Sequence, residues 1–250
     1  MTDLSQSIAI VTGGASGIGR ACVMALNESG ARVVFTYHSE EDTAQDIAAK
    51  TGAIPVQTDV GDEDAVASLF ARCEEEFGTP TLLVNSAGLN MSGTCLVDME
   101  LAHFDKVVRT DLYGPFLTCR AFARAAKEGG RIVNISSIHE DAPRAGAVDY
   151  DAAKGGLAQL TATLALELAP RRIAVNGVAP GMILTPMNEE AMDDEEVRRK
   201  AEANIPWGRA GTPEEVAALV VFLLSPAADY ITGATVTIDG ALSQVVAPGA

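Results

Sequence analysis

The stretch Ile8-Ala9-Ile10-Val11-Thr12-Gly13-Gly14-Ala15-Ser16-Gly17-Ile18-Gly19 decides the fold of this chain. Its first five residues form a short apolar run rich in β-branched side chains, which is typical of a buried strand. A glycine-rich turn follows, and a helical pattern begins near residue 17. The glycines permit a tight turn and a close backbone approach to a pyrophosphate, and a helix N-terminus offers free N–H groups to such an anion. This strand–turn–helix unit therefore predicts a nucleotide site.

Short strands and helical patterns alternate over the rest of the chain. The strands are expected at Ile8–Thr12, Arg32–Tyr37, Ile54–Gln57, Thr81–Asn85, Arg131–Ile135, Arg172–Val178 and Thr235–Ile238. The helical patterns lie near 17–29, 40–51, 62–77, 101–127, 152–169 and 213–224. Strands that alternate with helices form right-handed βαβ units and a parallel sheet covered on both faces. We therefore expect one domain over residues 1–250, with an α/β fold: a Rossmann-like doubly wound parallel sheet of about seven strands with helices on both faces.

Residues 181–211 interrupt this alternation. Pro180-Gly181 opens the segment, an acidic run occupies its middle, and Ile205-Pro206-Trp207 precedes the next helix. An insertion of this length after the C-terminal end of a strand is a candidate lid over a ligand crevice. We expect the acidic run to be a solvated surface helix, and the flanks, Met182–Met187 and Ile205–Trp207, to face the ligand. The acidic run consists of Glu189, Glu190, Asp193, Asp194, Glu195 and Glu196.

The chain is strongly acidic, with a formal net charge of −16 at pH 7. Nucleic acids and anionic membrane surfaces bind basic patches, so this charge argues against both as partners. Residues 1–12 lack the basic start and the long apolar run of a signal peptide. The longest apolar stretch, Val216–Leu224, is too short to span a bilayer. We therefore expect a cytoplasmic protein.

The cysteines and histidines do not form a metal-binding pattern. Cys22, Cys73, Cys95 and Cys119 are widely spaced and contain no Cys-x-x-Cys pair, and the chain has only three histidines. A closed structural zinc site needs four ligands at short spacings, so no metal site is expected. We expect the cysteines to be buried thiols in a reducing compartment.

Two segments at strand ends are further candidates for nucleotide contacts. Asp59-Val60 follows the third expected strand, where the carboxylate could accept from an adenine amino group; the alternative is a cap for the helix that begins near Asp62. Asn85-Ser86-Ala87-Gly88 ends the fourth strand, where small residues permit the backbone to approach a flat ring or a ribose. Both segments lie at the C-terminal edge of the sheet, where ligands bind in such folds.

Tyr150 and Lys154 are four residues apart, a spacing that places both side chains on one face of a helix. An ammonium beside a phenol favours the phenolate. Ser137, at the end of the fifth expected strand, could hold a substrate oxygen near that phenol. Together the three side chains would form a proton-transfer device for an alcohol or a carbonyl.

With these motifs in this order, the chain resembles the short-chain dehydrogenase/reductase family over essentially its whole length. Thr12–Gly19 is similar to the family's cofactor turn, and Asn85–Gly88 to its Asn-[Asn/Ser]-Ala-Gly motif. Pro180-Gly181 with Thr185 resembles the loop that closes on the nicotinamide. The residues that this resemblance and the strand-end positions assign to the cofactor are Gly13, Ser16, Gly17, Ile18, Gly19, Tyr37, His38, Ser39, Asp59, Val60, Asn85, Ala87, Gly88, Tyr150, Lys154, Pro180, Gly181, Ile183 and Thr185.

The resemblance also implies a role for each catalytic residue. Tyr150 would be the general acid/base at the substrate oxygen, Lys154 would favour its phenolate form and bind the nicotinamide ribose, and Ser137 would orient the substrate. Hydride transfer would belong to the cofactor. One position departs from the family: Asp111 replaces the usual Asn, whose main-chain carbonyl is thought to hold a water in the proton path. We expect Asp111 to keep that geometry, to add a negative charge near Lys154 and to alter the pH profile; a neutral substitution is the alternative.

The choice between NAD and NADP depends on the end of the second strand. NAD-preferring members of the family usually place an Asp there to bind the ribose 2′-hydroxyl, whereas this chain has Tyr37. Ser39 could donate to a 2′-phosphate, and His38 could assist when protonated. Against this, Ser16 stands where many NADP enzymes carry Arg, and Glu40-Glu41 lies close by. On balance we expect NADP, with NAD as the alternative.

Several segments resemble bacterial glucose 1-dehydrogenases: Ser136–Glu140, the Tyr150–Lys154 motif with the two glycines after it, and Thr185–Asn188. This resemblance implies a sugar or polyol as substrate, and a homotetramer. His139 could bind substrate hydroxyls or pack beneath the lid, and Asn90 is a candidate for the pocket rim. Glucose, other aldoses, polyols, diols and small ketones are all compatible with these motifs.

Two other functions stay open. The first is reduction of a 3-oxoacyl thioester or a small ketone. The net charge would repel an acidic acyl carrier protein, unless a local basic patch of Lys127, Arg171 and Arg172 allowed docking. The second is a non-catalytic cofactor-binding regulator, which would be expected to lose Tyr150 or Lys154, whereas this chain keeps both.

Overall fold

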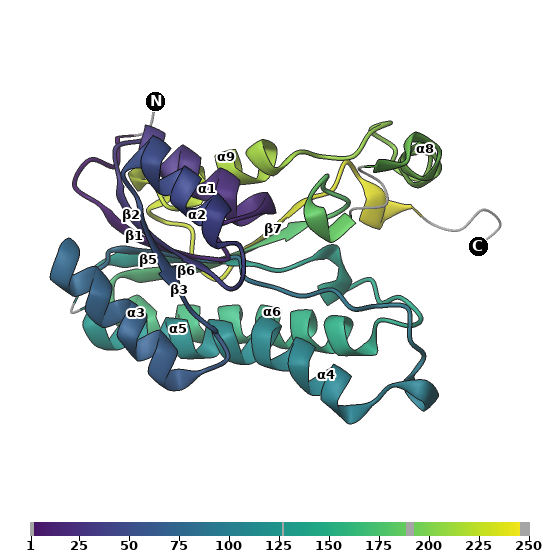
Figure 1. Ribbon diagram of the computed structural model, residues 1–250, viewed down its shortest axis with the longest axis horizontal. Helices are drawn as coiled ribbons and strands as arrows, with labels where there is room; N and C mark the ends of the chain where they lie inside the picture. Colours follow the sequence, from purple (N-terminus) through teal and green to yellow (C-terminus); the bar gives the residue numbers. More distant parts are fainter. Residues whose placement is uncertain (1–2, 127, 189–192, 246–250) are drawn as a thin grey trace.

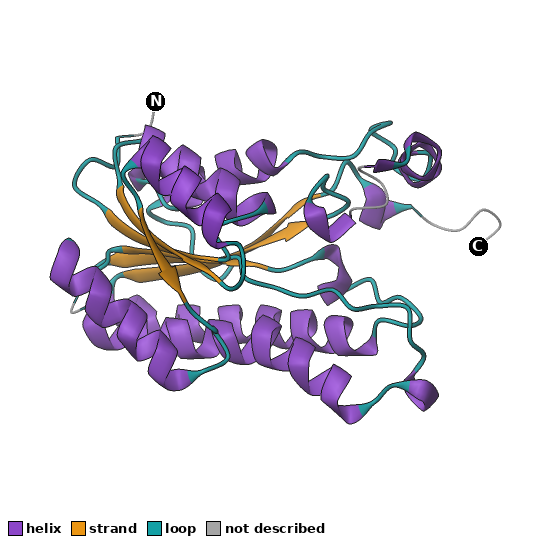
Figure 2. Cartoon of the chain, viewed as in Figure 1, coloured by secondary structure: helices purple, strands orange, loops and turns teal. Residues whose placement is uncertain are grey.

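The computed structural model describes residues 3–126, 128–188 and 193–245, and they form one seven-stranded parallel sheet with helices on both faces (Figures 1 and 2). The strand order is β3-β2-β1-β4-β5-β6-β7, with every neighbouring pair parallel. The strands are β1 (Ile8–Thr12), β2 (Arg32–Tyr37), β3 (Ile54–Gln57), β4 (Leu82–Asn85), β5 (Gly130–Ile135), β6 (Ile173–Pro180) and β7 (Thr235–Ile238). The predicted Rossmann-like doubly wound fold is confirmed.

The helices form one layer on each face of the sheet (Figure 1). One layer contains α1 (Gly17–Glu28), α2 (Glu41–Thr51) and α9 (Pro213–Leu223). The opposite layer contains α3 (Glu63–Glu76), α4 (Leu101–Val108), α5 (Gly114–Ala125) and α6 (Val148–Leu168). The short helix α8 (Glu195–Glu202) lies beyond the sheet, on the side where the described chain ends. The order of the strands reverses between β1 and β4, and the crevice beyond the C-terminal ends of these strands is where such folds bind ligands.

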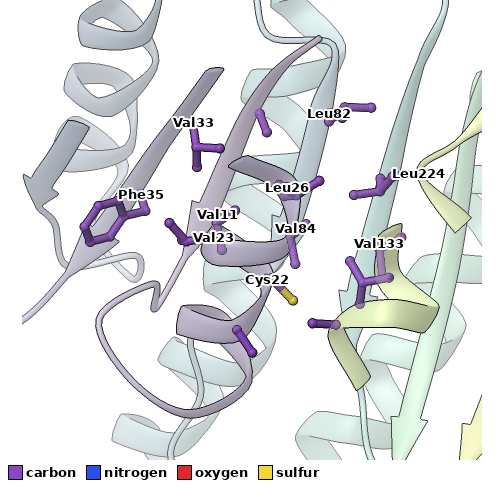
Figure 3. Packing of buried hydrophobic residues seen from close by; sticks show 14 of the residues in the cluster. Val11, Cys22, Val23, Leu26, Val33, Phe35, Leu82, Val84, Val133 and Leu224 are labelled. Atoms are coloured by element: carbon purple, nitrogen blue, oxygen red, sulfur yellow. The ribbon is translucent and has the colours of Figure 1, made fainter. Parts of the chain in front are cut away.

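Each face of the sheet has its own apolar core. Val11 of β1 packs with Cys22 and Leu26 of α1 and with Phe35 of β2 on the α1 face (Figure 3). The preceding residue, Ile10, belongs to the opposite core, because successive side chains of a strand point to opposite faces. This explains why the strands read as continuous apolar runs rather than as alternating patterns.

Two helices differ from the expectation. The helix expected at 152–169 begins at Val148, so Tyr150 lies in its first turn. The helix expected at 101–127 contains a π-helical turn, η2 (Arg109–Tyr113), between α4 and α5, and ends at Ala125; Lys127 lies outside the described residues. A π-helical turn inserts one extra residue per turn, a feature that apolar spacing does not reveal. Asp111 lies in this turn and is fully buried.

The predicted start of α9 is confirmed. Thr212 caps the helix by accepting from the Glu215 N–H, and the Glu215 carboxylate accepts from the Thr212 N–H in return, which satisfies two otherwise free donors. Part of the acidic run forms the exposed first turn of α8, as expected, and Glu189 and Glu190 lie outside the described residues. The remaining short helical turns are η1 (Leu96–Asp98), η3 (Ile138–Glu140), η4 (Ala169–Arg171), η5 (Pro186–Asn188), η6 (Pro226–Ala228) and η7 (Leu242–Gln244). None of the helices in the described ranges has the length and apolar content needed to cross a membrane.

Candidate active site

The glycine-rich turn after β1 is packed so closely that side chains are excluded. A Cβ on Gly19 would lie 2.1 Å from the carbonyl oxygen of Gly13, and one on Gly13 would lie 2.8 Å from the Cα of Ala87. Gly13 also has a φ of +66°, which favours glycine. The turn thus sits against the loop that follows β4, and its backbone is the surface offered to a ligand.

Two threonine hydroxyls hold this turn in place. Thr36 of β2 accepts from the Gly13 N–H at 3.0 Å, and Thr12 accepts from the N–H groups of Ser86 and Ala87 at 3.1 Å each. The first turn of α1 has no side-chain cap from its N-cap residue, Ser16. Its N–H groups are therefore available to an anion, as a pyrophosphate site requires.

Two adjoining cavities extend from the turn and share Gly13, Ser16, Ala87 and Gly88. The larger, about 500 Å³, lies beside the ends of β2 and β3 and is lined by the predicted residues Tyr37, His38, Ser39, Asp59 and Val60. The smaller, about 170 Å³, reaches the candidate catalytic side chains and is lined by the predicted residues Gly17, Ile18, Gly19, Ser137, Tyr150, Lys154, Pro180, Gly181, Ile183 and Thr185. The structure therefore brings most of the predicted cofactor and catalytic residues to one continuous crevice.

The larger cavity is also lined by residues that the sequence did not assign to the site, among them Lys106, Arg109 and Thr110. These three come from the end of α4 and the start of η2. Lys106 and Arg109 add two positive charges to the larger cavity, where the predicted residues include no Lys or Arg. Their i, i+3, i+4 spacing places them on one helical face, which was the available signal.

The two interpretations of Asp59 are separated by the structure. Asp62, not Asp59, caps α3, because its carboxylate accepts from the Ala65 N–H at 2.8 Å. Asp59 accepts from the Gly61 N–H at 2.8 Å and lines the larger cavity. Its carboxylate is thus held at the position proposed for an adenine contact.

Lys154 is buried and fixed by two contacts. Its ammonium donates to the carbonyl oxygen of Ile135 at 3.1 Å and lies 3.1 Å from the Oδ2 of Asp111. The ammonium also lies 5.4 Å from the centre of the Tyr150 ring. An ammonium has three N–H donors, so one remains for a ligand in the crevice.

From the sequence, Asp111 is expected to add a negative charge near Lys154. The structure shows that the two side chains form a direct ion pair. The other carboxylate oxygen, Oδ1, accepts from the Leu89 N–H at 2.7 Å. Burial raises the pKa of the Asp111 carboxyl, an effect that Lys154 opposes. Burial also disfavours the Lys154 ammonium, but Asp111 and Tyr150 outweigh this and leave the Lys154 pKa raised. The charged form of Lys154 is therefore secured at neutral pH.

Ser137 and Tyr150 are almost fully buried and face the same small cavity. The Ser137 oxygen accepts from the His139 N–H at 3.2 Å, which leaves its own hydrogen free to donate. With Lys154, these side chains place a phenol, a hydroxyl and an ammonium at one end of the crevice, the groups that a proton-transfer site requires.

Four predicted site residues line neither cavity: Asn85, Asn90, Asp111 and His139. The Asn85 side chain is buried, donates to Asn134 at 2.8 Å and accepts from Thr118 at 2.6 Å. A cofactor contact at this position would therefore involve the backbone. Asn90 accepts from the Ser92 N–H, and the His139 ring lies edge-on to Tyr150 with centroids 5.9 Å apart.

Only one flank of the lid reaches the catalytic crevice. Ile183, Thr185 and Met187 line the smaller cavity. Met182 and Trp207 instead line a separate cavity beside β7, and Ile205 is buried. The flank Ile205–Trp207, which was expected to face the ligand, lines neither part of the crevice: the Trp207 N–H donates to the Gly240 carbonyl oxygen at 3.1 Å, and a Cβ on Gly240 would lie 2.9 Å from the Trp207 Cβ. No cluster of three or more potential metal ligands is found within the described ranges.

Comparison with known proteins places this geometry among oxidoreductases. A family model described as enoyl-(acyl carrier protein) reductase matches residues 13–243. The chain is 36% identical to glucose 1-dehydrogenase 2 of Bacillus subtilis, covering 96% of each chain. It is 39% identical to a 3-oxoacyl-[acyl-carrier-protein] reductase of Synechocystis sp., covering 97% of this chain and 99% of the relative. A solved short-chain dehydrogenase/reductase from Serratia marcescens superimposes with a TM-score of 0.89 at 34% identity, covering 95% of this chain and 98% of the other.

Proposed function

Because the chain belongs to the short-chain dehydrogenase/reductase family, we propose that it is a dehydrogenase of a sugar or polyol. The family makes it an oxidoreductase that uses a nicotinamide cofactor and acts on CH–OH or carbonyl groups. The observation that carries the proposal is that Ser137, Tyr150 and Lys154 line the same cavity as the glycine-rich turn. A hydride carrier and a proton donor can therefore meet there.

The crevice fits a dinucleotide. The turn leaves no room for a Cβ at Gly13 or Gly19, the start of α1 lacks a side-chain cap, and the two cavities adjoin. The pyrophosphate would lie on this turn, with adenosine in the larger cavity and nicotinamide in the smaller. When bound, the nicotinamide supplies or accepts the hydride.

The chain's own residues move the proton. The Tyr150 hydroxyl gives a proton to a carbonyl oxygen during reduction, or takes one from an alcohol during oxidation. Ser137 donates a hydrogen bond to the same oxygen and stabilises its negative charge. Lys154, held by Ile135 and Asp111, directs its remaining N–H to the ribose and favours the phenolate.

A panel assay tests the proposal. Sugars, polyols, ketones and 3-oxoacyl thioesters are incubated with each nicotinamide cofactor, and the change in nicotinamide absorbance is recorded. We expect turnover of sugars or polyols and a loss of about 10²–10⁴-fold in Tyr150→Phe, the range that one acid/base group supplies. Turnover confined to thioesters overturns the substrate, and full activity of the variant overturns the mechanism.

The thioester alternative has weaker support from the surface. The basic patch considered for carrier docking is reduced, because Arg171 donates to the carbonyl oxygens of Ala123 and Ala126. Arg172 is exposed but lies 4.0 Å from Asp229, and Lys127 is outside the described residues. Docking of a carrier at Arg171 and Arg172 would therefore compete with contacts that these two side chains already make within the chain.

We propose NADP as the preferred cofactor, with NAD as the alternative. Tyr37, His38 and Ser39 line the larger cavity together with Lys106 and Arg109, and these polar and basic groups can bind a 2′-phosphate. Initial rates at matched concentrations of NAD and NADP test this. A strong preference for NAD contradicts it.

We further propose a homotetramer in the cytoplasm. A groove of about 780 Å³ between α5, α6 and η2 is lined by Leu112, Tyr113, Phe116 and Leu160, and the two aromatic rings are exposed. Exposed apolar surface of this kind is typical of subunit contacts. The cysteines are all free, as a reducing compartment allows. Sedimentation of the purified protein at a monomer mass would contradict the tetramer.

A further inference from the structure

Residues 138–147 join Ser137 to the start of α6 and lie beside the Tyr150 ring through His139; we call this segment the β5–α6 wall. It begins directly after Ser137 with η3 and ends just before α6, which carries Tyr150. Any movement of this wall changes the surroundings of both catalytic groups. What holds the wall is therefore relevant to which substrates the site accepts.

Asp151, the residue after Tyr150, ties the middle of the wall to α6. Its Oδ2 accepts from the backbone N–H of Arg144 at 2.7 Å, and only 12% of its side chain is exposed. A hydrogen bond from a backbone N–H to an ionised carboxylate is among the stronger kinds in proteins. The carboxylate thus fixes a loop position that has no strand or helix to hold it.

A carbonyl oxygen of the wall, that of Ala142, sets the proton arrangement of His139, and the Asp151 carboxylate lies nearby. The Nδ1 of His139 lies 2.9 Å from the carbonyl oxygen of Ala142 and 3.4 Å from the Oδ1 of Asp151. Both neighbours are acceptors only, so Nδ1 must carry the proton. In the neutral ring Nε2 is then an acceptor, and it has no partner among the described residues.

His139 belongs to the immediate surroundings of the reacting phenol. Its ring meets the Tyr150 ring edge-on, with centroids 5.9 Å apart and an interplanar angle of 76°. A fifth of its side chain is exposed. A hydroxyl bound beside the reacting carbon can therefore come within reach of an acceptor that this protein has already oriented.

The far end of the wall holds the loop after β4. The carbonyl oxygen of Gly146 accepts from the Gly93 N–H at 2.7 Å, and the Arg144 guanidinium donates to the Ser92 hydroxyl. Asn90, in the same loop, accepts from the Ser92 N–H at 3.1 Å. Through the wall, Asp151 is thus connected to two of the residues that the sequence assigned to substrate binding, His139 and Asn90.

We propose that Asp151 is a positioning residue for a substrate with neighbouring hydroxyls. Its bond with the Arg144 N–H fixes the β5–α6 wall, which carries both His139 and the Ala142 carbonyl that holds the Nδ1 proton, so that Nε2 accepts from the hydroxyl next to the reacting carbon. This inference rests on the proposed sugar or polyol dehydrogenase. A carboxylate in the first turn of a helix also stabilises that helix. That purely structural role would not discriminate between substrates, so discrimination is the property to measure.

The test compares a polyol that has adjacent hydroxyls with a cyclic alcohol that has one. Steady-state kinetics are measured for the wild type, Asp151→Ala, His139→Ala and the double variant, at saturating cofactor. For the polyol we expect Asp151→Ala to raise KM about tenfold with kcat within about threefold of the wild type, because uniform binding is lost. For the cyclic alcohol, and for the cofactor, we expect an unchanged KM.

The double variant and a matched control complete the design. Because both residues act on one contact, the two changes should be non-additive, with the double variant close to His139→Ala. Asp141→Ala removes an exposed carboxylate from the same wall and should leave both KM values unchanged. Where Asp151→Ala yields no folded protein, Asp151→Asn replaces it: the amide oxygen still accepts from Arg144, and a smaller rise of the polyol KM is expected.

The outcomes separate the two proposals. A wild type that turns over no alcohol or carbonyl overturns the proposed function. A wild type that oxidises the polyol, with equal effects of Asp151→Ala on both substrates or with additive effects in the double variant, overturns only the role of Asp151. A wild type active on the cyclic alcohol but not on polyols overturns the Nε2 contact.

Discussion

The glycine-rich turn and the catalytic end of the crevice lie side by side, but they are built on different physical grounds. The turn, residues 12–19, contains no ionisable side chain. Its shape depends on glycines, because a Cβ at Gly13 or Gly19 would clash with neighbouring backbone. The catalytic end buries Asp111, Asp149 and Lys154, and His103 lies 3.1 Å from Asp149. The turn is therefore sensitive to added volume, and the catalytic end to a charge left without its partner.

The largest expected effect on stability is at the catalytic end, in the buried ion pair of Lys154 and Asp111. Lys154→Met leaves the Asp111 carboxylate buried beside an apolar side chain, and removing one partner of a buried ion pair costs about 3–5 kcal/mol of unfolding free energy. Urea unfolding at pH 7 measures this cost. The double variant Lys154→Met/Asp111→Asn carries no unpaired charge and should recover most of the loss. Equal stability of the wild type and the single variant would show that the pair is not energetically coupled.

A slightly smaller effect is expected for added volume in the turn. Gly19→Ala places a Cβ 2.1 Å from the carbonyl oxygen of Gly13, and backbone cannot move aside as a side chain can. We expect a loss of about 3 kcal/mol, the upper end for overpacking, together with loss of cofactor binding. Urea unfolding and quenching of intrinsic fluorescence by the cofactor measure the two effects.

Gly52 provides the matched control for the turn. It has a φ of +70°, and no atom lies within 4 Å of the position that a Cβ would take, so Gly52→Ala tests backbone strain without a clash. This strain costs about 1 kcal/mol and leaves cofactor binding intact. A loss in Gly19→Ala no larger than in Gly52→Ala would refute the steric account of the turn.

The third effect concerns pH and sharpens the role of charge. In the wild type, the Asp111 carboxylate helps to raise the Lys154 pKa; Asp111→Asn removes this effect, so the charged form of Lys154 is lost at a lower pH than in the wild type. The pH–rate profile for alcohol oxidation should then move to lower pH by about one unit. An unchanged profile would mean that Asp111 only holds Lys154 and Leu89 in place.

The smallest effect is expected where charge is exposed. Glu40, at the mouth of the larger cavity, accepts from the Ser39 hydroxyl at 2.9 Å and from its N–H at 3.2 Å, the groups that a 2′-phosphate would use. Glu40→Gln should raise kcat/KM with NADP by up to about fivefold and leave NAD unchanged, because solvent weakens exposed charges. Glu41→Gln, a change of the same charge one residue away, serves as the control. Equal gains with both cofactors would argue against selection at the 2′ position.

Much of the site could be predicted because its signals are local. The turn at residues 12–19, the strand ends at Asp59 and Asn85, and the four-residue spacing of Tyr150 and Lys154 are each readable from a short window. Most strands needed little or no change in their bounds, since a parallel sheet buries continuous apolar runs. The start of α6 differs more: it lies at Val148 instead of residue 152. The sequence of Val148-Asp149 does not distinguish a loop from a first helical turn, and packing decides.

The remaining features depend on contacts between distant segments. The π-helical turn brings Asp111 to Lys154, which lies 43 positions later in the sequence. The order of helices and strands does not show whether two such distant side chains are in direct contact. The Asn85 side chain is hydrogen-bonded to Asn134 and Thr118. Although Asn85 lies at a strand end where ligands bind, its side chain is therefore part of the buried core. Trp207 packs beside β7 instead of lining the crevice. Its hydrogen-bond partner, Gly240, is distant in sequence, so a short window could not reveal this contact.

The sequence by itself determined the alternation of strands and helices, the glycine-rich turn and the four-residue spacing of Tyr150 and Lys154, because each follows from local sterics, hydrophobic periodicity or a short spacing. Only the tertiary structure decided which carboxylate pairs with Lys154, which cations face the larger cavity and how Asp151 holds the β5–α6 wall. Those arrangements depend on distances between segments that are joined only through the packed sheet and its two helical layers.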